Sequence, residues 1–214
     1  MRLSVIAAAS NRIEARYLVE SADKHKVPLT VYDKGGNDLP MEEWIRRVRI
    51  QPAEYVLSTD AYDVLVSRWD EDEVISLIDA EPSGIINSCE ADCWPGGPWA
   101  AAYKPETPWW ACNGGQFCGR REAIVAMLEE NARQVNTAGG GNQERLHRMV
   151  AAGYPIGLDQ KCRIFQSMAG VASKYIGSLD GNLFNSFTGT YPMFAHFNGR
   201  TMGIEIWRDL LAQD

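Results

Sequence analysis

The segment LSTDAYDVLV, residues 57–66, places Asp60 and Asp63 three positions apart, directly after an apolar run. Two carboxylates this close repel each other, so their proximity costs free energy unless a cation lies between them. Hard oxygen ligands of this kind suit Mg²⁺ or Mn²⁺. Ligands of open α/β sheets bind beyond the carboxyl ends of the strands, so the pair predicts a metal site where a strand over 54–60 ends. The alternative is that one aspartate caps the next turn while the other is solvated.

A third candidate ligand lies far along the chain. His196 is inside the apolar run PMFAHFNG (192–199), whereas the other two histidines, His25 and His147, lie in polar, helix-like stretches. A histidine in an apolar run is commonly a hydrogen-bonded core residue. A nitrogen ligand beside two carboxylates would instead favour Mn²⁺ over Mg²⁺.

The elements that must position these residues alternate between strand and helix. We expect strands at 3–9, 29–33, 54–60 and 84–91, with helices from Ser10 or Asn11 to about Lys26, at 41–50 and at 71–80. This alternation predicts an α/β fold with a mostly parallel central sheet flanked by helices. We also expect a turn at 34–38 within this segment. After it we expect a glycine-rich strand at 113–119, helices near 120–133 and 142–151, a strand and turn at 191–199, and a closing helix at 204–213.

The stretch between the fourth strand and the glycine-rich strand interrupts this rhythm. Residues 92–112 contain four prolines and four tryptophans, Trp94, Trp99, Trp109 and Trp110. A long ordered loop inside a compact domain is usually functional. Tryptophans at this position could line a ligand site and exclude water, or could pack as an aromatic cluster of the core.

Composition limits the classes of protein. The 214 residues, 45% hydrophobic and 23% charged, suit a single α/β domain over 1–214. The net charge of −7 argues against a general nucleic-acid surface, although Arg46, Arg47 and Arg49 form a small basic patch. Five cysteines without a CxxC pair indicate free thiols. The absence of a signal-peptide pattern or an apolar stretch long enough for a membrane span predicts a cytoplasmic protein.

Five motifs occur in a fixed order: TDAYDVLV (59–66), CEADCWP (89–95), NGGQFCG (113–119), LDQKCRIFQSMAG (158–170) and HFNG (196–199). They resemble the glycosyltransferase domain of the procollagen lysyl hydroxylases and the related collagen glycosyltransferases. That family carries close forms of DxYDV, AExxCWP, LNSGGFIG, LDxxxRIFQ and HGNG at similar spacings. The resemblance covers about residues 54–199 and implies a GT-A (Rossmann-like) fold that uses a UDP-sugar and Mn²⁺, or Mg²⁺.

The resemblance also implies roles for individual residues. Asp60 and Asp63 would bind the metal, with His196 as the third protein ligand. Tyr62, with Ala9 and Ser10 at the end of the first strand, would lie on the nucleotide side. The donor sugar and diphosphate would be lined by Asn113, Gly114, Gly115, Asn198 and Gly199, with Trp94 in a loop over the site.

The chain departs from the family pattern at a position where a catalytic base would be expected. In place of an acidic run it has GGGNQERL, so Asn142 and Gln143 could bind a sugar hydroxyl but could not act as bases. Glu144 follows them, either in compensation or as a solvated first-turn acid. The candidate catalytic bases are therefore Glu90, Asp92 and Asp159, although Asp159 could instead pair with Arg163. In a retaining reaction the leaving phosphate could take the acceptor's proton, and the sequence leaves retention and inversion open.

The sequence therefore predicts a metal-dependent glycosyltransferase that moves glucose or galactose from a UDP-sugar to a hydroxyl acceptor. The acceptor is left open between a protein, a glycan, a lipid-linked sugar and a hydroxymethylated base of phage-type DNA. One alternative is a UDP-sugar-binding protein with little transferase activity. A metal-dependent hydrolase is another, and a nucleotidyltransferase is disfavoured because AAASNRIEA lacks a basic glycine-rich loop.

Overall fold

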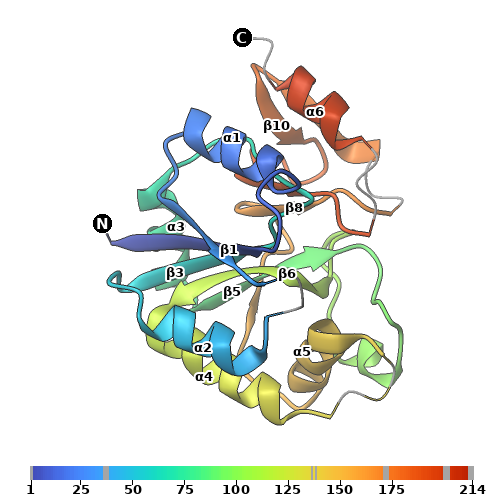
Figure 1. Cartoon of the computed structure of the whole chain (residues 1–214). Helices are drawn as coiled ribbons and strands as arrows, with labels where there is room; N and C mark the ends of the chain where they lie inside the picture. Colours follow the sequence, from blue (N-terminus) through green and yellow to red (C-terminus); the bar gives the residue numbers. More distant parts are fainter. Residues whose placement is uncertain are drawn as a thin grey trace.

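A computed structural model describes residues 2–35, 39–135, 137, 139–170, 174–199 and 203–211 (Figure 1). The first half contains β1 (Leu3–Ala9), α1 (Arg16–Lys24), β2 (Leu29–Asp33), α2 (Met41–Arg49), β3 (Tyr55–Thr59), β4 (Val64–Val66), α3 (Glu71–Ala80), β5 (Ile85–Glu90) and the 3₁₀ helix η1 (Pro98–Ala102). The second half contains β6 (Ala111–Arg120), α4 (Arg121–Arg133), α5 (Gly141–Ala151), β7 (Gly157–Leu158), β8 (Phe165–Ser167), β9 (Ile176–Leu179), β10 (Asn182–Asn185), β11 (Phe194–His196) and α6 (Ile204–Leu210).

The central sheet has six strands in the order β2-β1-β3-β6-β5-β7. The pairs β1–β2, β1–β3 and β5–β7 are parallel, whereas β6 runs antiparallel to both of its neighbours. The predicted α/β fold with a mostly parallel sheet is therefore confirmed. Because only β6 is reversed, the carboxyl ends of β1, β3 and β5 meet the beginning of β6 at one edge.

Helices cover both faces of this sheet, so its strands are apolar on both sides. Leu3, Val5 and Ala7 of β1 pack into the same core cluster as residues of α1 and α3, while Ile6 packs with residues of α2 and α4. This alternation follows from the two-residue period of a strand. Figure 1 shows α2 and α4 below the sheet and α1 and α3 above it.

A smaller sheet extends the edge where the strands end. It has the order β4-β11-β8, with β11 antiparallel to β4 and parallel to β8. His196 is registered with Val64 in this sheet, directly after Asp63. The small sheet thus brings a residue near the end of the chain to the DxxD segment.

The prediction for the first helix was wrong at its start. The helix begins at Arg16 after Ala15, and neither Ser10 nor Asn11 caps it. The Asn11 side chain accepts the backbone N–H of Ile13 at 2.9 Å, which makes a local turn that competes with helix formation.

Several smaller predictions have clear outcomes. The sequence analysis did not identify β4 or β7 to β10, which are at most four residues long. The strand and turn over 191–199 is confirmed by β11 and the turn at 198–199. The five cysteines are free thiols, as expected.

The turn at 36–38 and the last residues of the closing helix, 212 and 213, lie outside the described residues. In the described part of the chain, no helix has the length and apolar character needed to cross a membrane.

Candidate functional site

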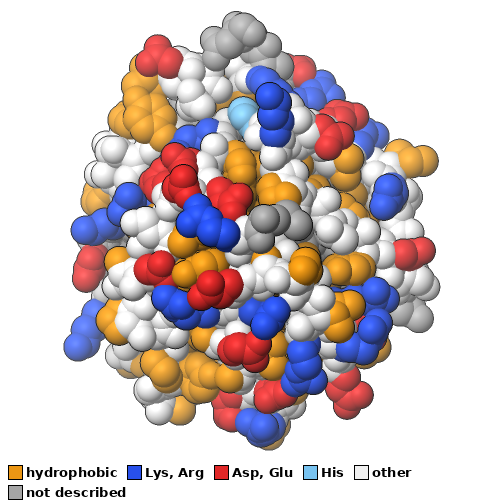
Figure 2. All heavy atoms as spheres, turned by 90° about the vertical axis from the view of Figure 1, so that its left-hand side faces the viewer, with side chains coloured by type: hydrophobic (Ala, Val, Ile, Leu, Met, Phe, Trp, Pro, Cys, Tyr) orange, Lys and Arg blue, Asp and Glu red, His pale blue; other side chains and the backbone are white. Residues whose placement is uncertain are grey.

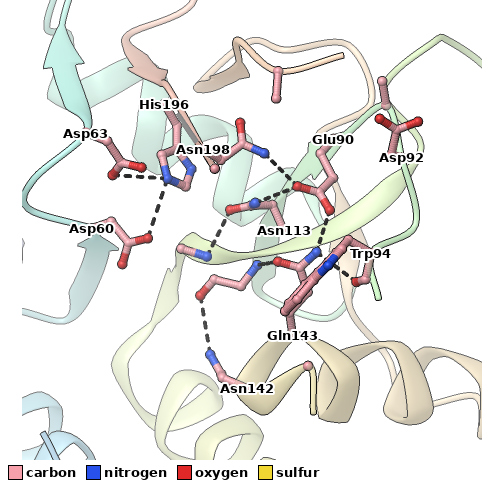
Figure 3. A pocket seen from close by; sticks show the side chains of 16 residues that line it. Asp60, Asp63, Glu90, Asp92, Trp94, Asn113, Asn142, Gln143, His196 and Asn198 are labelled. Carbon is pink, nitrogen blue, oxygen red and sulfur yellow. Dashed lines mark hydrogen bonds and ion pairs between the residues drawn. The ribbon is translucent and has the colours of Figure 1, made fainter. Parts of the chain in front are cut away.

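A cavity of about 540 Å³ opens at the edge where β1, β3 and β5 end (Figure 3). Its walls come from β5, the start of β6, the first turn of α5, and the segment after β11. Thirteen of the residues predicted for the site line this cavity: Asp60, Asp63, Glu90, Asp92, Trp94, Asn113, Gly114, Gly115, Asn142, Gln143, His196, Asn198 and Gly199.

One end of the cavity carries Asp60, Asp63 and His196, which we call the Asp–His cluster. The imidazole Nε2 of His196 lies 3.4 Å from Asp60 Oδ2 and 3.4 Å from Asp63 Oδ1. One ligand atom from each residue lies within 4.8 Å of the other two. The His196 side chain is 3% exposed, while that of Asp60 is 56% exposed. The cluster is therefore rigid on the histidine side and open on the carboxylate side.

The fold fixes the cluster through backbone contacts on both sides. The N–H of Asp60 donates to the carbonyl of Gly115 at 2.8 Å, and the N–H of Phe197 donates to the carbonyl of Asp63 at 2.8 Å. A Cβ atom at Gly115 would lie 2.4 Å from Asp60 Oδ2 and 2.5 Å from His196 Cε1. Only glycine fits between these two side chains.

The protonation of His196 reflects the two carboxylates. Burial alone would lower the pKa of His196, but hydrogen bonds and charge from Asp60 and Asp63 outweigh it and raise the pKa to about 10. The imidazolium thus neutralises part of the negative charge. A divalent cation would replace that proton, and two carboxylate oxygens with one imidazole nitrogen are a donor set that fits Mn²⁺.

The other end of the cavity has a different acidic centre, which we call the Glu90 cluster: Glu90, Asn113, Gln143 and Asn198. Glu90 Oε2 accepts from Asn113 Nδ2 at 2.8 Å and from Asn198 Nδ2 at 2.7 Å, and Glu90 Oε1 accepts from Gln143 Nε2. Burial raises the pKa of Glu90, while hydrogen bonds from Asn113 and Gln143 lower it. Because these three partners are donors, the carboxylate is bound in its ionised form.

The amides of the Glu90 cluster are fixed at their oxygen ends as well. Asn113 Oδ1 accepts the N–H of Gly115 at 2.9 Å, and Gln143 Oε1 accepts the N–H of Gly114 at 3.0 Å. Asn142 Nδ2 donates to the carbonyl of Gly114 at 3.3 Å. Asn142 and Gln143 therefore hold the glycine pair of β6 in place.

Asp92 and Trp94 lie on the loop after β5. Within the described part of the chain, the Asp92 carboxylate makes no hydrogen bond. It lies close to Gly170, where a Cβ would be 3.2 Å from Asp92 Oδ2. Trp94 is 56% exposed, and its carbonyl accepts from Gln143 Nε2 at 3.0 Å. Outside the Asp–His cluster, Asp92 is thus a cavity acid with lone pairs available to a ligand.

Four predicted residues lie outside the cavity. Ala9 ends β1, and Ser10 follows it, with the Tyr62 hydroxyl 2.7 Å from the Ser10 nitrogen and 2.8 Å from the Ser10 hydroxyl. Asp159 lies in a different hollow, which places it away from the role of acceptor base.

Asp159 instead holds a local turn. Its carboxylate accepts the backbone N–H groups of Arg163, Ile164 and Phe165 at 2.8–2.9 Å. The expected side-chain ion pair with Arg163 is replaced by a backbone bond, since that guanidinium reaches Glu73 at 3.3 Å. Burial raises the pKa of Asp159, and the three backbone donors act against that shift.

Glu144 fits neither predicted role, because it is fully buried. Its carboxylate pairs with Arg148 at 2.8 Å and accepts the backbone N–H of Thr137 at 2.9 Å. It fixes the entry into α5 and does not reach the cavity.

The sequence analysis missed four participants, one of which is Ala91 in the cavity wall. Ser167 donates to Asn198 Oδ1 at 2.7 Å and so orients that amide toward Glu90. Gly140 and Ala169 line the cavity, and a Cβ at Gly140 would lie 2.6 Å from Pro95 Cδ. The glycine run at 139–141 was a signal for such a close approach, whereas nothing local marked Ser167 or Ala169.

Comparison with solved structures identifies the fold. The chain matches a galactosyltransferase, LgtC, solved in complex with donor and acceptor sugar analogs, with a TM-score of 0.56 over 97% of this chain and 95% of that one, at 11% identity. The fold is that of the GT-A glycosyltransferases. A glycosyltransferase involved in glycosylation of the major capsid of PBCV-1 matches with a TM-score of 0.49 over 96% of this chain and 99% of that one, at 15% identity.

The family follows from the sequence. Residues 30–204 match the family described as the PLOD GT domain, and the chain belongs to that family of GT-A glycosyltransferases. An uncharacterized protein of Acanthamoeba polyphaga mimivirus is 27% identical over 169 residues, which is 78% of this chain. The match spans 36% of that viral protein's length.

Proposed function

We propose that this glycosyltransferase binds a UDP-hexose, glucose or galactose, with Mn²⁺ at the Asp–His cluster and transfers the hexose to a hydroxyl acceptor. The observation that carries the proposal is the convergence of Asp60, Asp63 and His196 within 4.8 Å at the rim of the cavity. Asp60 is 56% exposed and lines the cavity, so a cation in the cavity could reach this cluster.

The donor would lie across the cavity from this cluster. A bound cation would neutralise the diphosphate and stabilise the charge on the leaving group. Gly114 and Gly115 have no side chains, so the donor sugar could approach the backbone of β6 closely. Tyr62, fixed by Ser10, would face the nucleoside from the β1 side. Trp94 would exclude water from the sugar–phosphate bond.

The acceptor side would be served by Asp92. Its carboxylate has free lone pairs and lines the same cavity, so it can receive the proton of an incoming hydroxyl. Glu90 is less suited to this step, because its oxygens already accept three hydrogen bonds from amides.

The acceptor itself would be a protein or glycan hydroxyl rather than a DNA base. The basic patch that would favour DNA is largely offset, since Arg46 and Arg47 share Glu43 at 2.6 Å and Arg49 bonds to Glu129 at 2.6 Å.

A second candidate function is a nucleotide-sugar-binding protein with little turnover. It is favoured by Asn142 and Gln143, which bond to Gly114 at the position where the family has acids. A protein of this kind would bind the donor as the transferase does.

One experiment separates these functions. UDP-, GDP- and CDP-sugars are screened by thermal shift with and without Mn²⁺, because a ligand that binds only the native state raises the melting temperature. The positive donor is then incubated with hydroxyl acceptors, and UDP release is measured. A Mn²⁺-dependent shift for one UDP-hexose and acceptor-stimulated UDP release support the transferase. A shift without release supports the binding protein, and no shift with any nucleotide contradicts both.

A further inference from the structure

His147 is a fully buried histidine on α5 that does not line the cavity. Its Nε2 lies 2.9 Å from the carbonyl oxygen of Trp94, and its Nδ1 lies 2.5 Å from the hydroxyl of Tyr103. The ring of Trp99 stacks parallel to the imidazole, with 6.3 Å between centroids and 4° between planes. The two hydrogen bonds and the stacking restrict the ring to one orientation.

The partners of His147 also determine which nitrogen carries the proton. A carbonyl oxygen can only accept, so Nε2 must donate to Trp94. Nδ1 then accepts from the hydroxyl of Tyr103, which in turn accepts the backbone N–H of Cys112 at 3.4 Å. Burial lowers the pKa of His147, which favours the neutral ring. The chain of donors runs from β6, through Tyr103 and His147, to the loop that carries Trp94.

The Trp94 carbonyl is held from two points on one helix. Gln143 and His147, one turn apart on α5, both donate to it, at 3.0 and 2.9 Å. The next residue, Pro95, lies against Gly140, where no larger residue fits. The backbone of Trp94 is therefore fixed, although its side chain is 56% exposed and forms part of the cavity wall.

We propose that His147 is a positioning residue: in its Nε2–H form, held by Tyr103, it fixes the Trp94 backbone and so places the indole at the cavity. The placement of the indole stands on these contacts alone. Its consequence for sugar transfer rests on the proposed function, so the test observes the side chains directly and needs no substrate.

The tautomer is the first readout. The full chain, labelled with ¹⁵N-histidine, has only three histidines, and the His147→Gln variant assigns the signal of His147. Long-range ¹H–¹⁵N spectra at pH 7.5 should show His147 as the neutral Nε2–H form. An Nδ1–H form or an imidazolium at this pH would overturn the proposal.

The order of the indole is the second readout. The chain has seven tryptophans, and loss of one indole N–H signal in Trp94→Phe identifies that of Trp94. In His147→Phe the ring stacking is kept but both hydrogen bonds are lost, so the heteronuclear NOE of the Trp94 indole should fall to that of a mobile side chain, while the signals of Trp109 and Trp110 stay rigid. His147→Gln, whose amide can still donate to the carbonyl, should recover most of the order.

Tyr103→Phe provides an independent variant, because it retains every ring and removes only the hydroxyl that fixes the tautomer. It should mobilise the same indole, and it decides the question if His147→Phe does not fold. A Trp94 indole that keeps its order in Tyr103→Phe and in a folded His147→Phe would reduce His147 to a packing residue and overturn the proposal.

Discussion

The cavity contains two acidic centres that lie on neighbouring segments and differ in how their charge is satisfied. In the Glu90 cluster one buried carboxylate accepts three amide hydrogen bonds. In the Asp–His cluster two carboxylates share one imidazole at 3.4 Å, and Asp60 is 56% exposed toward the cavity. The first centre has its partners within the fold, whereas the second has more negative charge than the fold neutralises.

This difference indicates which acid holds other residues of the site in place and which acids are suited to bind a cation. A buried carboxylate satisfied by donors rigidifies the groups around it, and those groups here hold the glycine pair of β6. Carboxylates with unused lone pairs, placed together, are suited to an external cation. We therefore propose that Glu90 is a positioning residue and that Asp60 and Asp63 are the metal ligands.

The largest expected effect concerns the cavity acid outside both centres, Asp92. If Glu90 is occupied with positioning, the acceptor's proton goes to Asp92, and Asp92→Asn should lower kcat by about 100-fold, in the range of general-base catalysis. Binding of UDP with Mn²⁺ should stay unchanged, as measured by calorimetry. An unaltered kcat would mean that the leaving phosphate or Glu90, and not Asp92, takes the acceptor's proton.

Gly115→Ala tests the Asp–His cluster without removing a ligand. The added methyl group would lie 2.4 Å from Asp60 Oδ2, so the carboxylate and His196 must move apart. Metal affinity should fall by roughly 10–100-fold, the usual cost of disturbing the groups that orient a metal ligand. The matched control is Gly177→Ala in β9, where a Cβ meets no atom within 4 Å. Equal Mn²⁺ affinity in both variants would contradict the geometry of the cluster.

Glu90→Gln and Asp60→Asn compare the two centres by stability. The first replaces a carboxylate that satisfies three donors, and the mismatch should lower the free energy of unfolding by about 1–3 kcal/mol. The second changes a half-exposed group, and Asp63 remains as a partner for His196, so it should lower the free energy of unfolding by less than Glu90→Gln does. Urea denaturation measures both, and a reversed order would mean that Asp60 is the structural acid.

The smallest expected effect is the number of protons that the protein releases when Mn²⁺ binds. The pKa of His196 in the metal-free protein, about 10, lies above the ordinary value of 6.5, so its two ion pairs stabilise the fold fully below pH 6.5 and are lost as the pH rises through 10. Only neutral imidazole binds metal, so Mn²⁺ should release about one proton at pH 7.5, and affinity should increase with pH up to 10. Calorimetry in two buffers of different ionisation enthalpy counts the proton. A count of zero would exclude His196 as a ligand.

The parts of the fold and site that could be predicted are those with a local signal. The strand before Asp60 was readable from its apolar run, and the close aspartates and the apolar context of His196 were readable from short segments. Ser10 was misread because its neighbour Asn11 uses its side chain for a turn. Asp159 was misread because its carboxylate serves three backbone N–H groups four to six residues ahead.

The Glu90 cluster could not have been predicted in this form. Glu90, Asn113, Gln143 and Asn198 come from β5, β6, α5 and the turn after β11. Their contacts depend on the reversed direction of β6 and on the register between Glu90 and Ala111, neither of which has a signature within the segment itself.

The most direct test is a Mn²⁺ titration, with UDP present, of the unaltered protein, Asp63→Asn, Glu90→Gln and Asp72→Asn. Asp72 is an exposed acid of α3 paired with Arg2, at the opposite edge of the sheet, and serves as the control. The account predicts one Mn²⁺ site that is lost in Asp63→Asn and kept in Glu90→Gln and Asp72→Asn. Mn²⁺ binding that survives in Asp63→Asn, or that disappears in Asp72→Asn as well, would contradict the assignment of the Asp–His cluster.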